Sequence, residues 1–269
     1  MEFPKNVLPP GFEDFVETLL SEVESIEGYL SPTEIRFLAL LAAVRTADGE
    51  ILEIGSFKGK STIVLTKAAS LLEKTVVHAV DPMIAPSITD PDLNGDPSSL
   101  PDFQKNISAH DLEDQIRLHQ NFSFELAETW DKPLRLLWID GDHTYRGTKQ
   151  DFDGFSKHLS DGAIVAMHDV LHEFEGGLRV FMEDVLLSPN FAACGFVGSI
   201  AWGQFHNDDK KSKRFQAQKL KYYKQLARLV PYVVFREKLE GFEKMKYKLF
   251  RSRLPRAPMK PAEWLAMID

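Results

Sequence analysis

Two apolar runs of the sequence, 134–139 and 163–167, each end in acidic residues and histidine. The side chains that follow them are Asp140, Asp142, His143, His168 and Asp169. Burying charged groups of this kind without partners is costly, so core packing does not require them at the ends of two apolar segments. A site that does chemistry explains them better.

Three of these residues form a set that suits a metal ion. If the two runs are neighbouring parallel strands, their carboxyl ends open onto one cleft, where Asp140, His168 and Asp169 can converge. Oxygen-rich ligand sets suit Mg²⁺ or Mn²⁺, and the histidine makes Mn²⁺, Fe²⁺ or Zn²⁺ conceivable. We therefore predict a divalent ion at this cleft, with Mg²⁺ or Mn²⁺ expected first.

A second chemical feature is the glycine turn within the segment ILEIGSFKGKST (51–62). Glycines at such a turn let the backbone approach a ligand, and the helix that follows offers free N–H groups. A Walker A loop needs four residues between its glycines, whereas Gly55 and Gly59 enclose three. A dinucleotide fingerprint needs a glycine two positions after Gly55, which is absent. The pattern that remains is E-x-G-x-x-x-G.

This turn resembles that of the class I S-adenosylmethionine-dependent methyltransferases. In that family an acidic residue before the first glycine and the turn itself hold the methionine part of the cofactor, and an acidic residue after the second strand binds both ribose hydroxyls. A carboxylate suits a diol because it accepts two hydrogen bonds at once. The alternatives are a helix-capping Asp81 and a surface Glu53. The resemblance implies S-adenosylmethionine (SAM) as cofactor, bound by Glu53, Gly55, Ser56, Phe57, Gly59, Ser61 and Asp81.

The segments IDGDHTYRGTKQDF and AIVAMHDV extend the resemblance over roughly 32–200. They closely resemble a bacterial subfamily, the methyltransferase-24 group, and more distantly the metal-dependent catechol and caffeoyl-CoA O-methyltransferases. In these metal-dependent relatives an Asp and an Asp-Asn pair bind the metal, and a Lys acts as base. Asp140 matches the first ligand, His168 and Asp169 replace the pair, and His143 falls at the base. The resemblance thus implies Asp140 and His143 as catalytic residues.

Three polar residues near these motifs each have two interpretations. Ser123 matches a position that contacts the adenine edge in related enzymes, but it also suits a helix N-cap. Asp142 contacts the cofactor amino group or caps the next helix, and Asp140 is expected beside the cofactor as well. His143 is either the N-cap of a helix over 145–159 or the general base. We favour the base, because an imidazole accepts a proton near pH 7.

The function implied by the resemblance is methyl transfer from SAM to a small-molecule hydroxyl, on a sugar, glycan or natural product, assisted by the divalent ion. Because the sulfonium methyl is already activated, the protein mainly has to align the acceptor oxygen and remove its proton. Alternatives are a catechol- or phenol-type O-methyltransferase and a non-catalytic cofactor-binding scaffold. A few relatives in this subfamily are hydroxylases.

Alternating β-rich and helical segments must position these residues. Helices are predicted over 11–27 and 32–46, the second with Ser31 as its N-cap. The rhythm predicts a doubly wound, Rossmann-like α/β fold with a seven-stranded, mostly parallel sheet and an antiparallel last strand. The Pro- and Asp-rich loop 82–103 is predicted to be a lid. The predicted strands are 50–54, 75–80, 115–120, 134–139 and 163–167, followed by an antiparallel pair, 196–200 and 201–205.

The charge of the chain is uneven. Residues 210–269 hold 17 Lys and Arg against 5 Asp and Glu, so residues 1–209 hold 32 − 17 = 15 against 40 − 5 = 35. We predict a class I methyltransferase domain over 1–209 and a basic helical C-terminal extension over 210–269. We favour an extension that folds back on the acidic body. The alternatives are peripheral attachment to a membrane surface and docking on an acidic partner.

The composition favours a soluble cytoplasmic protein. No run of about 18 apolar residues occurs, so no transmembrane segment is expected, and the N-terminus lacks a secretory signal pattern. The only cysteine, Cys194, excludes an intramolecular disulfide, which is typical of a reducing compartment. No recognition motif indicates a nucleic-acid partner. The expected partner is a small-molecule acceptor, and self-association into a homo-oligomer stays open.

Overall fold

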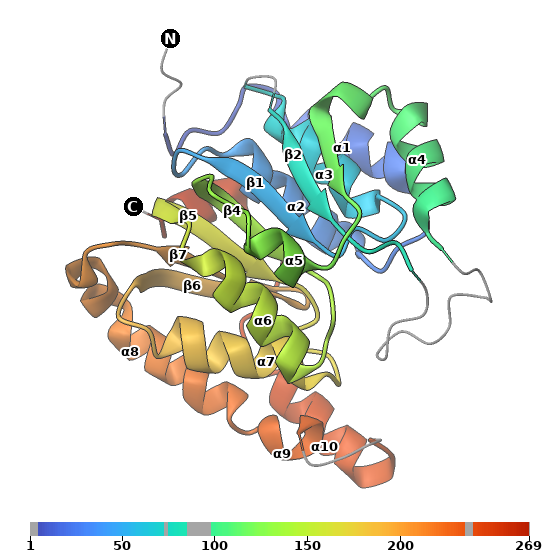
Figure 1. The fold of residues 1–269 in the computed structure, drawn as a ribbon. Helices are drawn as coiled ribbons and strands as arrows, with labels where there is room; N and C mark the ends of the chain where they lie inside the picture. The colour runs from blue at the N-terminus through green and yellow to red at the C-terminus, as the bar shows by residue number, and fades with distance from the viewer. Residues whose placement is uncertain (1–4, 73–74, 85–97, 235–238, 269) are drawn as a thin grey trace.

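A computed structural model describes residues 5–72, 75–84, 98–234 and 239–268. Its centre is a seven-stranded sheet with the strand order β3-β2-β1-β4-β5-β7-β6 (Figure 1). β7 runs antiparallel to both of its neighbours, and every other neighbouring pair is parallel. The predicted fold class is therefore confirmed. The strands are β1 (Glu50–Ile54), β2 (Val77–Val80), β3 (Ile116–His119), β4 (Leu134–Ile139), β5 (Leu159–Met167), β6 (Phe191–Val197) and β7 (Ile200–Phe205).

Helices cover both faces of the sheet (Figure 1). One face carries α1 (Phe12–Val23), α2 (Pro32–Ala43), α3 (Lys60–Ala69), α4 (Leu100–Ala109) and α11 (Pro261–Leu265). The other face carries α5 (Ser123–Ala127), α6 (Tyr145–Ser156), α7 (Glu175–Val180), the π-helical η2 (Phe181–Leu186), α8 (Asp209–Leu226), α9 (Val230–Val233) and α10 (Gly241–Arg251). A 3₁₀ turn, η1 (Glu113–Gln115), precedes β3.

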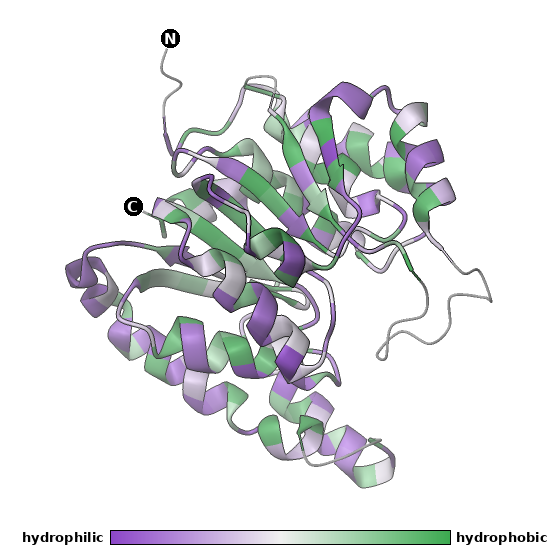
Figure 2. Cartoon of the chain, viewed as in Figure 1, coloured by the Kyte–Doolittle hydropathy of each residue, from purple (hydrophilic) through white to green (hydrophobic). Residues whose placement is uncertain are grey.

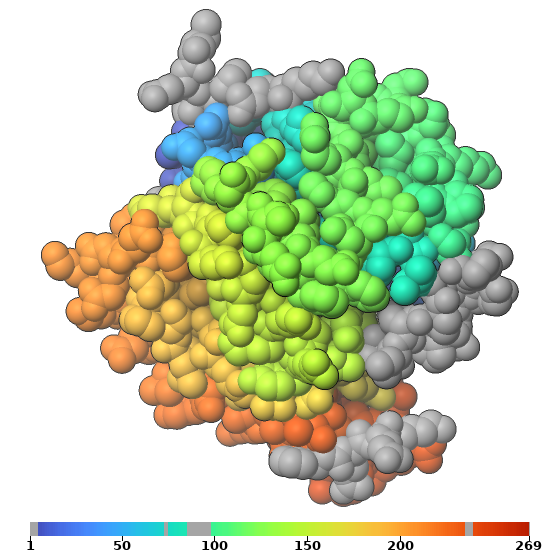
Figure 3. Space-filling model, in the orientation of Figure 1, coloured from blue at the N-terminus to red at the C-terminus, as the bar shows by residue number. Residues whose placement is uncertain are grey.

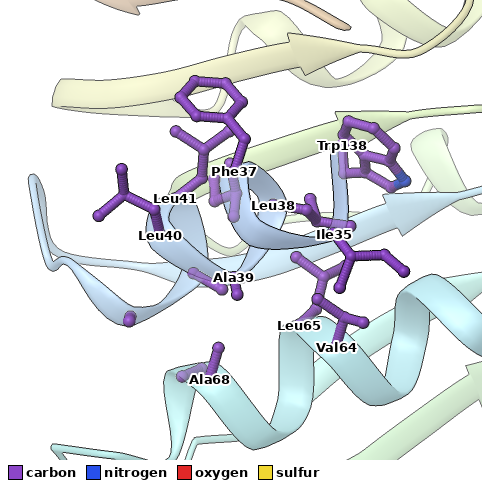
Figure 4. Close-up of a cluster of buried hydrophobic side chains, with 14 of the residues drawn as sticks. Ile35, Phe37, Leu38, Ala39, Leu40, Leu41, Val64, Leu65, Ala68 and Trp138 are labelled. Carbon is purple, nitrogen blue, oxygen red and sulfur yellow. The ribbon is translucent and has the colours of Figure 1, made fainter. Parts of the chain in front are cut away.

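The central strands are apolar on both sides because both of their faces are covered. In β4, Leu136 and Trp138 point into the core beneath α2 and α3, whereas Leu137 and Ile139 point into the core beneath α6 and α7. Figure 4 shows Trp138 beside the side chains of α2 and α3. Figure 2 shows the strands as a mostly green, hydrophobic layer between helices with purple outer faces. The polar residues that end β4 and β5 are thus carried by rigid, fully packed strands.

The antiparallel pair at the sheet edge differs in detail from the prediction. β6 begins at Phe191, and the chain reverses at Gly198 and Ser199, two residues before the predicted break between 200 and 201. Gly198 has a φ of +62°, a conformation that suits glycine and that the sequence pattern alone did not locate. Because β7 is antiparallel, this turn lies at the carboxyl end of β5.

Two further predictions concern the N-terminal helices and the lid. The predicted N-cap of α2 is confirmed, because the side chain of Ser31 accepts from the Glu34 amide in a capping box. Most of the predicted lid, 85–97, lies outside the described residues. The end of that loop forms the start of α4, at Leu100.

The C-terminal segment packs directly on the domain. α8 contacts β6 and η2, and α9 contacts α7. In the space-filling view the orange residues of the extension lie against the yellow residues of the body (Figure 3). Across the described ranges, no helix is both long enough and apolar enough to span a membrane.

Candidate active site

The turn after β1 is packed against the end of β4. Gly55 has a φ of +86°, and a Cβ at this position would lie 2.2 Å from the carbonyl oxygen of Asp140. The Asp140 amide donates to the Ile54 carbonyl at 2.8 Å. Gly59, with a φ of +87°, is the N-cap of α3. The glycine turn and the strand end that carries Asp140 are therefore held in contact, and only glycine fits at Gly55.

Glu53 is fully buried beneath this turn, so its predicted alternative as a surface residue is wrong. The Thr62 hydroxyl donates to Glu53 Oε2, but Oε1 has no hydrogen-bond partner among the described residues. Burial raises the pKa of Glu53 to about 7, although the hydroxyls of Ser61 and Thr62 act to lower it. An unpaired buried acceptor next to a glycine turn suits a ligand that brings an N–H donor.

Asp81 fixes the turn from the neighbouring strand. Its Oδ2 accepts from the amides of Ser56 and Phe57 at 2.8 and 2.9 Å, and its Oδ1 accepts from the Met83 amide at 2.7 Å. No helix begins beside it in the described chain, so it is not a helix cap. A carboxylate has about four acceptor positions, so Asp81 keeps capacity for a further donor.

Ser123 does not cap α5. The N-cap of that helix is Phe122, and the Ser123 hydroxyl donates to the carboxylate of Asp151 on α6. Burial raises the pKa of Asp151 to about 7, while the bond from Ser123 lowers it and the charge of Asp142 raises it. The first residue of α5 is therefore joined to α6 through this hydrogen bond.

The N-cap of α6 is Thr144, whose hydroxyl accepts from the Gly147 amide at 3.1 Å. The capping alternative for His143 is therefore wrong. Asp142 supports the cap, because its Oδ1 accepts from the Thr144 amide at 2.8 Å. The His143 ring instead stacks on Phe174, with 4.7 Å between ring centroids.

The structure brings the residues that end β4 and β5 into one cluster. His168 Nδ1 lies 3.1 Å from Asp140 Oδ1 and 3.3 Å from Asp169 Oδ1. His143 Nε2 lies 3.8 Å from Asp169 Oδ2. Asp169 has a φ of +54°, an uncommon conformation for a residue other than glycine that is often found at functional sites. The side chains of Asp140, His143, His168 and Asp169 therefore lie close together, as the sequence predicted.

Glu34 is a member of this cluster that the sequence did not reveal. Its Oε1 accepts from the Ser199 amide and hydroxyl at 2.7 and 2.6 Å, and its Oε2 accepts from the Ser31 hydroxyl at 2.7 Å. Oε2 also lies 3.8 Å from His168 Nε2. In the sequence Glu34 is an acidic residue in the first turn of the helix that Ser31 caps, and only the return of the chain at Ser199 shows its second role.

The carboxylates control the charge of the cluster. Burial alone would lower the pKa of His168, but Asp140, Glu34 and Asp169 raise it well above 6.5. Burial raises the pKa of Asp140, against the effect of His168. Burial would also raise the pKa of Glu34, but the neighbouring His168 and hydrogen bonds from Ser199 and Ser31 lower it well below its usual value. The cluster therefore holds a histidine cation between acidic side chains.

No three or more His, Cys, Asp and Glu side chains form a preassembled metal-binding group in the described parts of the chain. The three predicted ligands contact each other directly, through His168 Nδ1. The structure thus brings the predicted donors into contact with one another.

Comparison with known proteins gives a consistent result. Residues 52–170 match the family model described as a methyltransferase domain. The solved O-methyltransferase from Bacillus cereus in complex with SAH is 21% identical, with a TM-score of 0.51 over 74% of this chain and 92% of that one. The O-methyltransferase NovP is 14% identical, with a TM-score of 0.55 over 73% of this chain and 100% of that one.

A third solved structure is the O-methyltransferase TomG from Streptomyces achromogenes, involved in tomaymycin synthesis and in complex with SAM. It is 16% identical, with a TM-score of 0.51 over 73% of this chain and 90% of that one. At such identities the three likenesses establish the shared fold. Together with the matched domain, they show that residues 52–170 are similar to a methyltransferase domain and that the chain has the fold of these O-methyltransferases.

Proposed function

We propose that this chain transfers the methyl group of SAM to a hydroxyl of a small molecule, on a sugar, glycan or natural product. The observation that carries the proposal is the contact between the glycine turn and the polar cluster, where Gly55 abuts the backbone of Asp140. A cofactor on the turn and an acceptor at the cluster would be adjacent. Alignment of this kind is the main requirement of transfer from an activated methyl group.

The cofactor would be bound by the residues around the turn. The unpaired Oε1 of Glu53 suits the amino group of the methionine part, and Asp81 keeps acceptor capacity for the ribose hydroxyls. Asp140 lies against the turn, Asp142 follows the neighbouring strand β4, and Ser123 follows β3, two strands away from β1. The bound SAH and SAM of the Bacillus cereus enzyme and TomG support this choice of cofactor.

His143 would accept the proton of the acceptor hydroxyl. It follows the same strand end as Asp140, and Asp169 lies within ion-pair distance of its Nε2. A neighbouring carboxylate stabilises the imidazolium that forms when a histidine takes up a proton. The ring is held against Phe174, so its orientation is set before the acceptor arrives.

A divalent ion, Mg²⁺ or Mn²⁺, would be held by Asp140, His168 and Asp169. The oxygen-rich donor set suits these ions, and the separations of 3.1 and 3.3 Å are close to the spacing of about 3 Å between adjacent ligands of an octahedral ion. The ion would compete with the proton on His168 and would lower the pKa of a bound hydroxyl. If this part of the proposal holds, exhaustive chelation should abolish turnover and leave SAH affinity unchanged. Full activity after chelation would refute it.

A non-catalytic scaffold is the less favoured alternative, because a scaffold has no need for a partly buried cluster of Glu34, Asp140, His168 and Asp169 beside its cofactor turn. Methyl-transfer rates over a panel of acceptors would distinguish a sugar from a catechol- or phenol-type acceptor.

Peripheral membrane contact through the extension is supported by α10, where Phe242, Met245 and Leu249 are exposed. Their neighbours are Lys244, Lys246 and Lys248, which suit an anionic lipid surface.

Calorimetry and a methyl-transfer assay together test the proposed function. The wild type should bind SAM and SAH with micromolar affinity, and Asp81→Ala should lose this binding because the ribose contact and the turn are lost together. Methyl transfer should then be found over a panel of sugar, catechol and natural-product hydroxyls. Tight binding of ATP or NAD in place of SAM would refute the proposal.

A further inference from the structure

The C-terminal extension crosses the edge of the sheet at the candidate active site. Leu254 packs in the core on the α6 and α7 face, whereas Met259 and Trp264 pack in the core on the α2 and α3 face. Between them, the Arg256 carbonyl accepts from the Gly198 amide at 3.0 Å. Figure 1 shows the extension passing from beneath α7 to the red segment behind β4 and β5.

This crossing lies beside the cluster. Gly198 precedes Ser199, whose amide and hydroxyl both donate to Glu34, and Ser199 Oγ also lies 3.3 Å from Asp169 Oδ1. The backbone of Arg256 is therefore hydrogen-bonded to the turn at Gly198 and Ser199, which contacts the cluster. Because β4 and β5 separate β1 from β7 in the sheet, this contact places the extension on the side of the cluster away from the glycine turn, where it would form a wall of the site.

α10 contacts the loop that follows His168 and Asp169. The Tyr247 hydroxyl donates to the carbonyls of Leu171 and His172, both at 2.7 Å. Arg251 is four residues after Tyr247 and therefore lies on the same face of the helix. Its Nε is buried and has no hydrogen-bond partner among the described residues.

Arg251 and Arg256 are five residues apart, on either side of the core residue Leu254, and their charges act on each other. Burial lowers the pKa of Arg256, the charge of Arg251 lowers it further, and Glu34 and Tyr247 raise it. Both Glu34 oxygens are already engaged by Ser31 and Ser199. Two guanidinium groups that are partly buried and close together repel each other unless an anion lies between them.

Some other arginines of the chain have carboxylate partners. Arg36 pairs with Glu17 at 2.9 Å and Arg179 with Glu175 at 3.3 Å. Within the described ranges, no ion pair joins a carboxylate to Arg251 or Arg256, although Glu173 pairs with Lys244 nearby. An arginine pair of this kind has the donor geometry that recognises a carboxylate, phosphate or sulfate group.

We propose that Arg251 and Arg256 bind an oxyanion group of the methyl acceptor, so that the substrate of this enzyme is an acidic small molecule. The inference rests on the proposed function and specifies its substrate class. The hydroxyl to be methylated would lie at His143 and Asp140, and the anionic group would lie against the wall that the extension provides. The extension then acts as the part of the chain that selects the acceptor.

Inorganic phosphate and sulfate serve as probes, titrated into the full-length protein by calorimetry in the presence of SAH. Arg251→Gln and Arg256→Gln should each weaken phosphate binding at least fivefold, and the double variant should abolish it. Arg253→Gln is the matched control, because Arg253 is exposed two residues past the end of α10, its guanidinium group lies over the ring of Phe250, and its bond to Gln225 is made by the backbone carbonyl, which the substitution keeps. It should bind phosphate as the wild type does. Arg251→Lys, which keeps the charge, should retain part of the affinity.

The acceptor assay gives the second measurement. Matched pairs such as glucuronate and glucose, or 3,4-dihydroxybenzoate and catechol, differ mainly in one carboxylate, and the acidic member should have the higher kcat/KM. Undiminished phosphate binding by the double variant, or no preference for the acidic members in an enzyme that methylates both, would overturn the arginine assignment. Failure of the wild type to bind SAM or SAH would instead overturn the proposed function, and SAH affinity of each variant reports whether it is folded.

Discussion

Glu53 links the pH of the solution to the stability of the site. Its pKa is raised by burial from 4.5 to about 7, so near pH 6 the folded protein keeps a proton that the unfolded chain has lost. The contribution of Glu53 to the free energy of unfolding is fully present below about pH 4.5 and is lost as the pH rises toward 7. Each pKa unit corresponds to about 1.4 kcal/mol, so the free energy of unfolding falls by at most about 3 kcal/mol over this range.

Glu53→Gln should remove this part of the pH dependence in the cofactor-free protein. Asp151 acts in the same direction, since its pKa is also raised to about 7, so the variant should keep roughly half of the effect. Urea unfolding at pH 5.5 and pH 8 measures the difference. An unchanged pH dependence in Glu53→Gln would mean that the carboxyl ionises without cost inside the fold. The charge of the nearby Asp140 also raises the pKa of Glu53, and Asp140 is present in both the wild type and the variant.

His143→Ala tests the base at the end of β4. We expect kcat to fall by about 10²–10⁴-fold, the range for loss of a general base, with little change in SAH affinity because the ring contacts Phe174 and Asp169 rather than the turn. Steady-state kinetics with one saturating acceptor, beside calorimetry with SAH, separates the two effects. A wild-type rate in the variant would leave alignment as the main source of catalysis.

At the scale of elements, regular features were predictable and long-range contacts were not. The sequence predicted the two strand ends that carry Asp140 and His168, because apolar runs followed by charged residues are a local pattern. The capping roles of Ser123 and His143 were left open, since several polar residues in a row can each begin a helix. Only the folded chain shows that Phe122 and Thr144 occupy those N-cap positions.

Glu34 illustrates the limit of local reasoning. It stands three residues after the predicted N-cap, Ser31, and the structure shows that the two residues form a capping box. The same carboxylate also binds Ser199, 165 residues later, and faces His168. Nothing in the spacing of residues near Glu34 contains this information. The arginines of the extension were counted as part of a basic tail for the same reason, since their nearness to the site depends on where the chain crosses the sheet edge.

The turn after β1 provides a prediction at this scale. Gly55→Ala would place a Cβ 2.2 Å from the Asp140 carbonyl oxygen at a φ of +86°, so the turn must move away from β4. We expect a loss of several kcal/mol in the free energy of unfolding and loss of SAH binding. Gly11→Ala is the matched control, because Gly11 has a φ of +73° but no atom within 4 Å of the added Cβ. Equal losses in both variants would assign the effect to backbone conformation alone.

At the scale of the whole molecule, the basic C-terminal extension packs on the acidic domain that precedes it. The basic extension packs on the acidic body along α7 and η2, and its last helix returns to the core of the opposite face. Trp264 on α11 is fully buried there and lies against Phe37 of α2 and Trp202 of β7, at 6.5 and 5.9 Å between ring centroids. We therefore expect that residues 1–209 alone do not keep the stability of the full chain.

Trp264→Ala measures how strongly the extension is joined to the body. Removing a fully buried Trp should cost about 3–5 kcal/mol, through lost burial and a cavity beside Phe37 and Trp202. Phe242→Ala is the control, because Phe242 is 63% exposed on α10 and its loss should change stability by less than about 0.5 kcal/mol. Urea unfolding of both variants gives the comparison, and phosphate titration shows whether the wall at Arg256 is loosened as well. If Trp264→Ala unfolds at the same urea concentration as Phe242→Ala, the extension contributes nothing to the core, and an acceptor wall built on it could not be rigid.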